Sequence, residues 1–499
     1  MRKILSPFIL LGMLLTGCSG STPRGKDSDK NYDDIDQDTS GAPEITWDTK
    51  QESLRTGIKN IDFYNVNDTH GCIEENGEEP GISKISSYLK ERRNQNPEGF
   101  VFTSSGDMWQ GSADSNITRG KLIIDWMDYE GCSAMALGNH EFDWTIDVLK
   151  NNSAYAKHEF LACNIVDSTS KTPVDWVKPY TTITRNGVHI GIIGAIGEGI
   201  TGSILANNVK GLTFDRPDSY VVKWSKYLRD NGADVILFLY HYSTLETSYD
   251  LGKYVDGIFG GHNHALENTT FANGVRGYEG LSNGRAVSHI GIKYNFDNKS
   301  YSYGACGNAQ IYGSYFDKNS DVEAIKAKYA DEINHVKNEQ VANIDRYLDS
   351  YNDIPLLYDR YAYRYYQDIG GDKPITFIVT NNARNPLSPG IVTYGDIYKA
   401  LPFDNQLTLC HCKGRDIIEG ITNYSSSRWY FPGVGEYLID RSDVYNYLAL
   451  ETYYYFLAID YVSTYEGYTS WMNIEHYYAE ESSLPRNIMK TYLAKEYPL

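Results

Sequence analysis

The sequence has few cysteines, few long apolar runs and little positive charge. Its seven cysteines include no Cys-x-x-Cys pair, which argues against a zinc ribbon. The apolar run over residues 4–15 is too short to span a bilayer as a mature helix, and no other stretch is long and apolar enough to do so. The 46 lysines and arginines are outnumbered by 65 aspartates and glutamates, and a net charge of −19 repels the backbone of a nucleic-acid polymer.

The composition is that of a globular protein with more than one domain. Hydrophobic residues make up 41% of the 499 positions, which is enough for two or three full cores. The 43 tyrosines are unusual, and we expect most of them to pack as half-buried rings while some stack on a ring-bearing ligand. Small anionic substrates are compatible with the negative charge, because a bound dication reverses the local field.

The first residues have the composition of a targeting segment. Two basic residues precede the apolar run Ile4–Leu15, which ends in the sequence Leu-Thr-Gly-Cys18. This pattern is typical of a lipobox, in which the cysteine is acylated after cleavage; an ordinary secretory peptide with an incidental cysteine is the alternative. We therefore predict a signal peptide over residues 1–18 and a flexible tether over residues 19–55. The chain would be exported and held by lipid on Cys18, facing the periplasm or the cell surface of a bacterium.

From Ile61 onward, strand-like apolar runs alternate with segments of helical period, which is typical of a layered α/β fold. The predicted strands are residues 61–67, 99–104, 133–137, 160–165, 189–196, 235–240 and 257–259. Helices are predicted over residues 82–93 and 217–231, and a longer helix over 320–341 is expected to connect two domains. A second α/β region is expected from about Ile354 to the end of the chain.

Polar residues that can bind metal follow several of these buried strands directly. They are Asp68 and His70, then Asp107, then Asn139 and His140, then His241, and finally His262 and His264. In open α/β sheets the carboxyl ends of the strands are where sites form. One histidine at a strand end is usually structural, but five such elements in order indicate a metal site together. Without His140, the ligand set consists of two Asp, one Asn and four His. It mixes oxygen and nitrogen without thiolate, which favours Mn, Zn, Fe or Co over Ca or Mg alone.

Cys410, His411 and Cys412 form a second cluster of metal-binding residue types. They lie in a predicted strand over residues 406–412, so both thiols would share one face and His411 would lie on the other. A metal site there would lack further ligands nearby. We therefore expect the two cysteines to be small buried strand residues.

The order Asp-x-His, Gly-Asp, Gly-Asn-His-Glu, His, Gly-His-x-His resembles the signature of calcineurin-like metallophosphoesterases. Residues 67–71, 138–143 and 187–191 are similar to the branch that contains the bacterial 5′-nucleotidases, UDP-sugar hydrolases and 2′,3′-cyclic-nucleotide phosphodiesterases. The pattern continues, less completely, through Thr393–Tyr398 and Leu401–Asn405, which resemble the C-terminal substrate domain of that branch.

The resemblance implies a fold of two domains. An N-terminal four-layer α/β/β/α metallophosphoesterase sandwich would occupy residues 56–316, followed by a linking helix over 317–350. A C-terminal α/β substrate-binding domain would occupy residues 351–499. The protein would act as a monomer.

The resemblance also implies roles for the strand-end residues. One ion would be held by Asp68, His70 and His264, and the other by Asn139, His241 and His262. Asp107 would bridge the two ions, because a carboxylate can offer one oxygen to each. His140 would face the phosphate as a catalytic group rather than a ligand, with Asp143 orienting it.

The C-terminal domain in this family binds the nucleoside between two aromatic rings and the phosphate through arginines. The matching candidates are Arg384, Phe403, Asn405, Tyr461, Glu466 and Tyr468. Phe403 has the alternative of being an ordinary core ring. The chain departs from the family pattern at residues 380–383, where a glycine run is usual, and at residues 464–468, where Gly-Gly-Asp-Gly-Tyr is usual. The register of Arg360 and Arg364 is open, and so is the substrate.

The function implied is hydrolysis of nucleotides by in-line attack of a hydroxide held by two divalent ions. Two alternatives use the same ions, namely a 2′,3′-cyclic-nucleotide phosphodiesterase and a UDP-sugar pyrophosphatase. An alternative of another class is a surface lipoprotein that binds nucleotides or metal without turnover. The intact ligand set and His140 argue against this last alternative.

Overall fold

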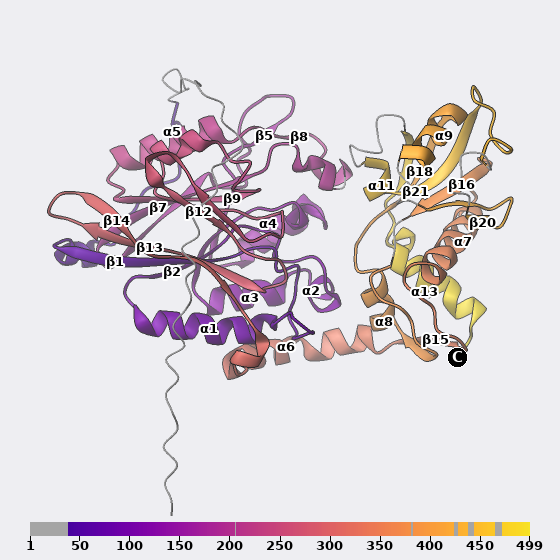
Figure 1. Cartoon of the computed structure of the whole chain (residues 1–499), viewed down its shortest axis with the longest axis horizontal. Coiled ribbons are helices and arrows are strands. Elements are labelled where there is room, and N and C mark those ends of the chain that lie inside the picture. Colours follow the sequence, from indigo (N-terminus) through magenta and orange to yellow (C-terminus); the bar gives the residue numbers. More distant parts are fainter. Residues whose placement is uncertain (1–37, 205, 381–382, 424–427, 438–443, 465–471) are drawn as a thin grey trace, which may run out of the picture.

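The computed structural model describes residues 38–499 except 205, 381–382, 424–427, 438–443 and 465–471. Two domains lie side by side, and helix α6 (Ser320–Lys337) runs from one to the other along one side of the molecule (Figure 1). The elements before α6 form the N-terminal domain, and those after it form the C-terminal domain.

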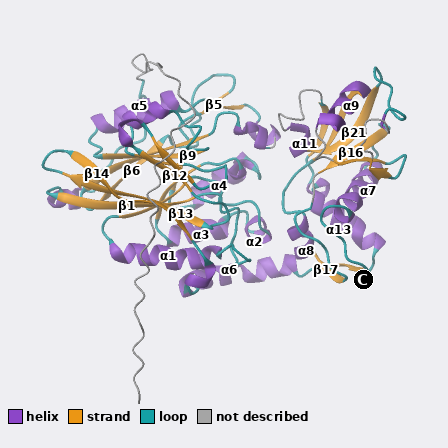
Figure 2. Cartoon of the chain, in the orientation of Figure 1, coloured by secondary structure: helices purple, strands orange, loops and turns teal. Residues whose placement is uncertain are grey.

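The N-terminal domain contains two six-stranded sheets packed face to face (Figure 2). The first sheet has the order β14 (Ser300–Gln310), β13 (Ala286–Asn295), β1 (Ile58–Val66), β2 (Phe100–Ser104), β3 (Cys132–Ala136) and β4 (Glu159–Leu161). The second has the order β11 (Glu267–Thr270), β12 (Arg276–Glu279), β10 (Gly257–Phe259), β9 (Val235–His241), β7 (Val188–Ile196) and β6 (Tyr180–Arg185). Neighbouring strands from β1 to β4 are parallel, as are β7, β9 and β10.

Helices cover the outer faces of both sheets. Helices α1 (Gly81–Gln95), α3 (Lys121–Tyr129) and α4 (Ile146–Tyr155) contribute apolar residues to a core with the first sheet. Helix α5 (Asp218–Asp230) contributes to a core with β7 and β9. The predicted four-layer α/β/β/α sandwich is therefore confirmed. Strands β7 and β9 are buried along their whole length, because both of their faces are covered.

Two predicted element boundaries in this part are wrong. The single strand expected over residues 160–165 is split into β4 and β5 (Ile165–Asp167), and β5 pairs with β8 (Leu212–Phe214) instead of the main sheet. The Asn164 amide donates to the backbone carbonyl groups of Ile196 and Asp215, which turns the chain between the two strands.

Helix α6 is also shorter than predicted. It begins after Asn319, whose side chain accepts hydrogen bonds from the first helical N–H groups, and it ends at Lys337. Residues 340–344 form β15 (Gln340–Ile344), which pairs with β17 (Gly390–Thr393) in the C-terminal domain. The C-terminal domain thus begins near Gln340, and the boundary predicted at residue 351 is too late.

The C-terminal domain is built on a mixed six-stranded sheet. Its order is β20 (Glu436–Tyr437), β19 (Arg428–Phe431), β16 (Ile375–Thr380), β21 (Tyr453–Ile459), β18 (Leu407–Lys413) and β22 (Asn473–Tyr478). The helices include α7 (Asp353–Asp368), α8 (Tyr394–Ala400), α9 (Gly414–Asn423), α11 (Asp460–Thr464) and α13 (Pro485–Glu496). The α/β substrate-domain prediction is confirmed as a fold. Cys410 and Cys412 are buried in β18, as predicted, and His411 is only half-buried.

The tether predicted over residues 19–55 is wrong in its last part. The Trp47 ring stacks on His189 with centroids 4.3 Å apart, and its indole N–H donates to the Asn231 carbonyl oxygen. The hydroxyl of Tyr180 donates to the carbonyl oxygen of Pro43, so the domain holds this segment from about residue 43 onward. Cys18 lies outside the described residues. Among the residues that are described, no helix has the length and apolar character needed to cross a membrane.

Candidate metal centre and interdomain pocket

The predicted ligands meet at one edge of the sandwich, where strands of both sheets end. Three of them, Asp68, His70 and His264, have donor atoms that all lie within 4.8 Å of one another. A second group with the same spacing consists of Asp107, His241 and His262. The structure therefore brings together side chains that are far apart in the sequence. The two most distant ones, Asp68 and His264, are separated by 196 positions.

Asn139 lies within the second group. Its side-chain oxygen is 3.1 Å from His241 Nε2 and 3.0 Å from His262 Nδ1. His241 Nε2 is also 3.2 Å from the Asp107 carboxylate, and the other ring nitrogen faces the Ser105 carbonyl oxygen at 2.7 Å. A hydrogen bond from Nδ1 to a carbonyl fixes the ring so that Nε2 is the atom presented to a metal.

Two observations indicate that the first group, Asp68, His70 and His264, can hold a divalent cation. The Nε2 atoms of His70 and His264 face each other at 2.9 Å, so two electron-rich nitrogens converge on one point. The Oδ1 atom of Asp68 is fully buried and has no hydrogen-bond partner in the described part of the chain. Buried carboxylates are normally paired or coordinate metal, and the mixed N/O donor set suits Mn, Zn, Co or Fe.

The backbone at these residues is strained. Asp68, His70, Asp107, His262 and His264 all have positive φ, between 48° and 79°, in the left-handed region that residues other than glycine rarely adopt. Hydrogen bonds between the loops hold this conformation: Asp68 N–H donates to the Gly106 carbonyl oxygen, and His70 N–H to that of Asp107. Strain of this kind costs about 1–3 kcal/mol per residue and is typical of functional sites.

Glu141 supports this backbone and was given no role in the sequence analysis. Its two carboxylate oxygens accept 2.8 Å hydrogen bonds from the backbone N–H groups of Gly138, Asp107 and Met108. Burial, together with the nearby Asp107 carboxylate, raises the pKa of Glu141 to about 7. A Cβ atom at Gly138 would collide with the Asp107 carboxylate and the His241 ring, so glycine is required there. The Gly-Asn-His-Glu motif was the available signal for Glu141.

His140 lies beside the metal-binding groups and is paired with Asp143. Its Nδ1 is 2.7 Å from Asp143 Oδ2, and its backbone N–H donates to Asp107 Oδ1 at 2.8 Å. Burial alone lowers the pKa of His140, but the Asp143 and Asp107 carboxylates outweigh it and raise the pKa to about 10. The Asp143 contact therefore fixes the orientation of the His140 ring at the edge of the site.

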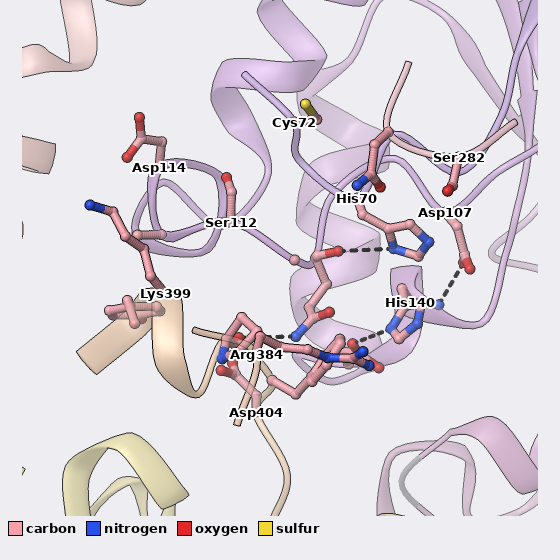
Figure 3. A pocket seen from close by; sticks show the side chains of 18 of the residues that line it. His70, Cys72, Asp107, Ser112, Asp114, His140, Ser282, Arg384, Lys399 and Asp404 are labelled. Carbon is pink, nitrogen blue, oxygen red and sulfur yellow. Dashed lines mark hydrogen bonds and ion pairs between the residues drawn. The ribbon is translucent and has the colours of Figure 1, made fainter. Parts of the chain in front are cut away.

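A pocket of about 970 Å³ opens in front of this centre, between the two domains. Its N-terminal wall includes His70, Asp107, Asn139, His140, Asp143, His262 and His264, and its C-terminal wall includes Arg384, Phe403, Asn405 and Tyr461. Figure 3 shows His140 and Asp107 on one side of this space and Arg384 and Asp404 on the other. The Phe403 ring lies 6.4 Å from that of His140 and within 22° of parallel, and the Arg384 guanidinium lies 5.2 Å from the Phe403 ring.

The structure separates the remaining candidates of the C-terminal domain. Phe403 is partly exposed to the pocket, so it is not the ordinary core ring of the alternative interpretation. Arg360 and Arg364 do not line the pocket; both lie near Glu496 of α13, at 3.7 and 3.5 Å. Glu466 and Tyr468 lie outside the described residues.

Comparison with protein-family models supports both domains. The calcineurin-like phosphoesterase model matches residues 61–266, and the model of the 5′-nucleotidase C-terminal domain matches residues 335–464.

Curated relatives are distant. An endonuclease of Bacillus subtilis is 25% identical over 71% of this chain and 32% of its own length. A cell wall protein of Listeria monocytogenes is 24% identical over 74% of this chain and 57% of its own length. An apyrase of Aedes aegypti is 24% identical over 72% of this chain and 71% of its own length. The matched region thus spans about a third of the Bacillus protein and just over half of the Listeria protein.

Solved structures have the same fold. A 5′-nucleotidase precursor from Thermus thermophilus superposes with a TM-score of 0.65 at 18% identity, covering 88% of this chain and 97% of its own. A putative 5′-nucleotidase from Staphylococcus aureus superposes with a TM-score of 0.68 at 16% identity, covering 87% of this chain and 97% of its own. The chain therefore belongs to the calcineurin-like phosphoesterases that carry a 5′-nucleotidase C-terminal domain.

Proposed function

We propose that this chain is a phosphoesterase with two divalent metal ions that hydrolyses nucleotides, as a 5′-nucleotidase does. The observation that carries the proposal is the shared pocket. Metal-binding side chains and the His140–Asp143 pair open onto the same space as the Phe403 ring and the Arg384 guanidinium. The metal-binding side chains suit a phosphate group, and the Phe403 ring on the opposite wall suits a ring system attached to that phosphate.

Each ion would have its own set of donors, with Asp107 common to both. Asp68, His70 and His264 would hold one ion, and Asn139, His241 and His262 would hold the other. When bound, the ions would supply Lewis acidity on the phosphoryl oxygens and a water of lowered pKa as the nucleophile. Mn, Zn, Co and Fe suit this donor set.

His140 would act on the leaving group. Asp143 faces Nδ1 and holds the ring in one orientation, so that Nε2 is the ring nitrogen available to a substrate in the pocket. A protonated imidazole at the pocket wall can stabilise charge on the phosphoryl group and pass a proton to the departing oxygen.

The C-terminal wall would select the rest of the substrate. Phe403 offers a ring face for a base, Arg384 offers positive charge, and Asn405 and Tyr461 lie in the same wall. Glu466 and Tyr468 remain proposed contacts on sequence resemblance. Relatives named apyrase and 5′-nucleotidase support nucleotides as the substrate class.

We place the protein outside the cytoplasm, as a monomer anchored by lipid on Cys18. The proposal rests on the Leu-Thr-Gly-Cys18 sequence and on the similarity to a protein named as a cell wall protein.

Metal analysis and a substrate panel test the function. The purified protein should hold two divalent ions per chain and should release phosphate from AMP faster than it cleaves 2′,3′-cyclic AMP or UDP-glucose. Faster cleavage of 2′,3′-cyclic AMP would favour the cyclic-nucleotide phosphodiesterase, and faster cleavage of UDP-glucose would favour the UDP-sugar pyrophosphatase. Two bound ions without turnover of any substrate would make the protein a binding protein and contradict the proposal.

A further inference from the structure

A short loop of the C-terminal domain, Pro402–Asp404, is bonded directly to the N-terminal domain. The carbonyl oxygen of Pro402 accepts hydrogen bonds from the side-chain amides of Asn116 at 3.2 Å and Gln110 at 3.4 Å. Gln110 lies on the N-terminal wall of the pocket, near Asp107, and Asn116 lies in the adjacent helix α2 (Ala113–Ile117). The loop of the second domain is therefore positioned by residues of the first domain.

The Asp404 carboxylate contacts both domains. Its Oδ2 accepts a 2.9 Å hydrogen bond from the indole N–H of Trp144 and lies 3.4 Å from the Arg119 guanidinium. Its other oxygen pairs with Arg486 of α13, within the C-terminal domain. Asp404, Trp144 and Arg486 are at most 8% exposed, so solvent screens these interactions little.

Each partner of Asp404 is itself held in place. In the N-terminal domain the Trp144 ring lies parallel to Trp109, with centroids 6.2 Å apart, and the Arg119 guanidinium lies 5.5 Å from the Trp144 ring. In the C-terminal domain the Arg486 guanidinium lies 4.4 Å from the Tyr398 ring. Partners that are already packed lose little conformational entropy when the contact forms.

The two loops that meet here also carry pocket residues. Trp144 directly follows Asp143, which orients His140, and Asp404 directly follows Phe403, whose ring faces His140. A hydrogen bond between Trp144 and Asp404 therefore sets the distance between the two functional loops. If the domains shifted, Phe403 would move away from His140, while the metal-binding groups would stay intact.

We propose that Asp404 is a positioning residue, which through Trp144 and Arg119 holds the C-terminal domain in the orientation that places Phe403 opposite His140. It makes the enzyme selective for phosphate esters that carry a nucleobase, because only these use the Phe403 face. The activity part of this inference rests on the proposed function, whereas the domain orientation does not.

Trp144→Phe removes the indole donor and keeps an aromatic ring in the same packing, and Arg119→Gln removes the second cross-domain donor. Trp126→Phe is the matched control, because its indole N–H also makes one buried hydrogen bond, to Ser86 Oγ at 2.7 Å, within the N-terminal domain. Spin labels at Ile58→Cys and Leu450→Cys, both on exposed side chains of different domains, report the interdomain distance in the full chain.

We expect Trp144→Phe to broaden the interdomain distance distribution. It should also raise KM for AMP about tenfold, because the loss of one hydrogen bond to a charged group corresponds to a change of about that size in affinity. Arg119→Gln should act in the same direction with a smaller effect. The kcat/KM for p-nitrophenyl phosphate should stay within about twofold of wild type in both, because this ester does not need the Phe403 face. Trp126→Phe should leave the distance distribution and both substrates unchanged.

Two results would overturn the inference. One is an unchanged distance distribution in both Trp144→Phe and Arg119→Gln. The other is an equal loss on AMP and p-nitrophenyl phosphate in Trp144→Phe, which would mean that Trp144 acts locally on Asp143. If the wild type cleaves no nucleotide, the proposed function fails, and the distance measurement still decides whether Asp404 holds the domains together.

Discussion

In the N-terminal domain the functional side chains follow the ends of buried strands, whereas in the C-terminal domain they stand on loops and at the start of a short helix. Asp68 and His241 are completely buried, but Tyr461 is 43% exposed and Arg384 is also exposed. The first set is held by hydrogen bonds between neighbouring loops, including those that Glu141 accepts. The second set depends on where one domain lies against the other.

The tasks that we propose for the two walls would account for this difference. Reaction at a phosphate requires donor atoms placed to within about 0.5 Å, which rigid strand ends can provide. Recognition of the rest of the substrate tolerates more movement, because stacking on a ring face is not strongly directional. Substitutions in the N-terminal wall should therefore affect all substrates, and those in the C-terminal wall only substrates with a base.

The largest effect is expected for His140→Asn, which tests the N-terminal wall. Turnover should fall by about 10²–10⁴-fold on every substrate, the usual contribution of a positioned acid–base group. Both metal ions should remain bound, as measured by elemental analysis. His158→Asn is the control, because His158 makes a similar pair with Asp128 at 2.7 Å on another part of the domain. Loss of an ion in His140→Asn would show that His140 is a ligand instead.

Glu141→Gln tests whether the support behind the ligands matters. An amide nitrogen would replace an oxygen that now accepts backbone N–H groups, so the Asp107 loop should shift. Metal affinity should fall about 10–100-fold, as is usual for residues that orient ligands, and a metal-binding titration measures this. Glu130→Gln, a buried carboxylate paired with Arg93, should leave metal affinity unchanged. Equal affinities in the two variants would contradict a supporting role for Glu141.

Phe403→Ala tests the C-terminal wall. Stacking of a base on one ring contributes about 1–3 kcal/mol, so KM for AMP should rise about tenfold while kcat/KM for p-nitrophenyl phosphate stays unchanged. Tyr461→Ala should have the same selectivity with a weaker effect. Tyr453→Ala, an exposed ring of the same domain that does not line the pocket, is the control. An equal loss on both substrates would make Phe403 a packing residue.

Cys18→Ser should have the smallest effect on chemistry. The kcat/KM should be unchanged, because the role proposed for Cys18 is attachment to the membrane and not the reaction. The protein should move from the membrane fraction to the soluble fraction when cells are fractionated. Equal membrane association of the variant and the wild type would refute the lipid anchor.

Local patterns predicted the elements that bear the candidate metal centre. The largely apolar runs before Asp68 and Asp107 predicted strands β1 and β2 to within a few residues, because strands covered on both faces are rich in apolar residues. Helix α6 was predicted four residues too long, since Val341 continues the helical period but lies in strand β15. Trp47 was assigned to the tether, because a single aromatic residue in a polar segment does not indicate what it packs against.

The sequence by itself determined the class of chemistry, because metal binding and acid catalysis depend on residue types at short spacings, such as His140 and Asp143. Only the tertiary structure decided how the two walls meet. Trp144 and Asp404 are 260 positions apart, and their hydrogen bond exists because two separately folded domains present a buried indole and a buried carboxylate to each other. No local period encodes such a contact, since each residue alone has the pattern of an ordinary packed or loop residue.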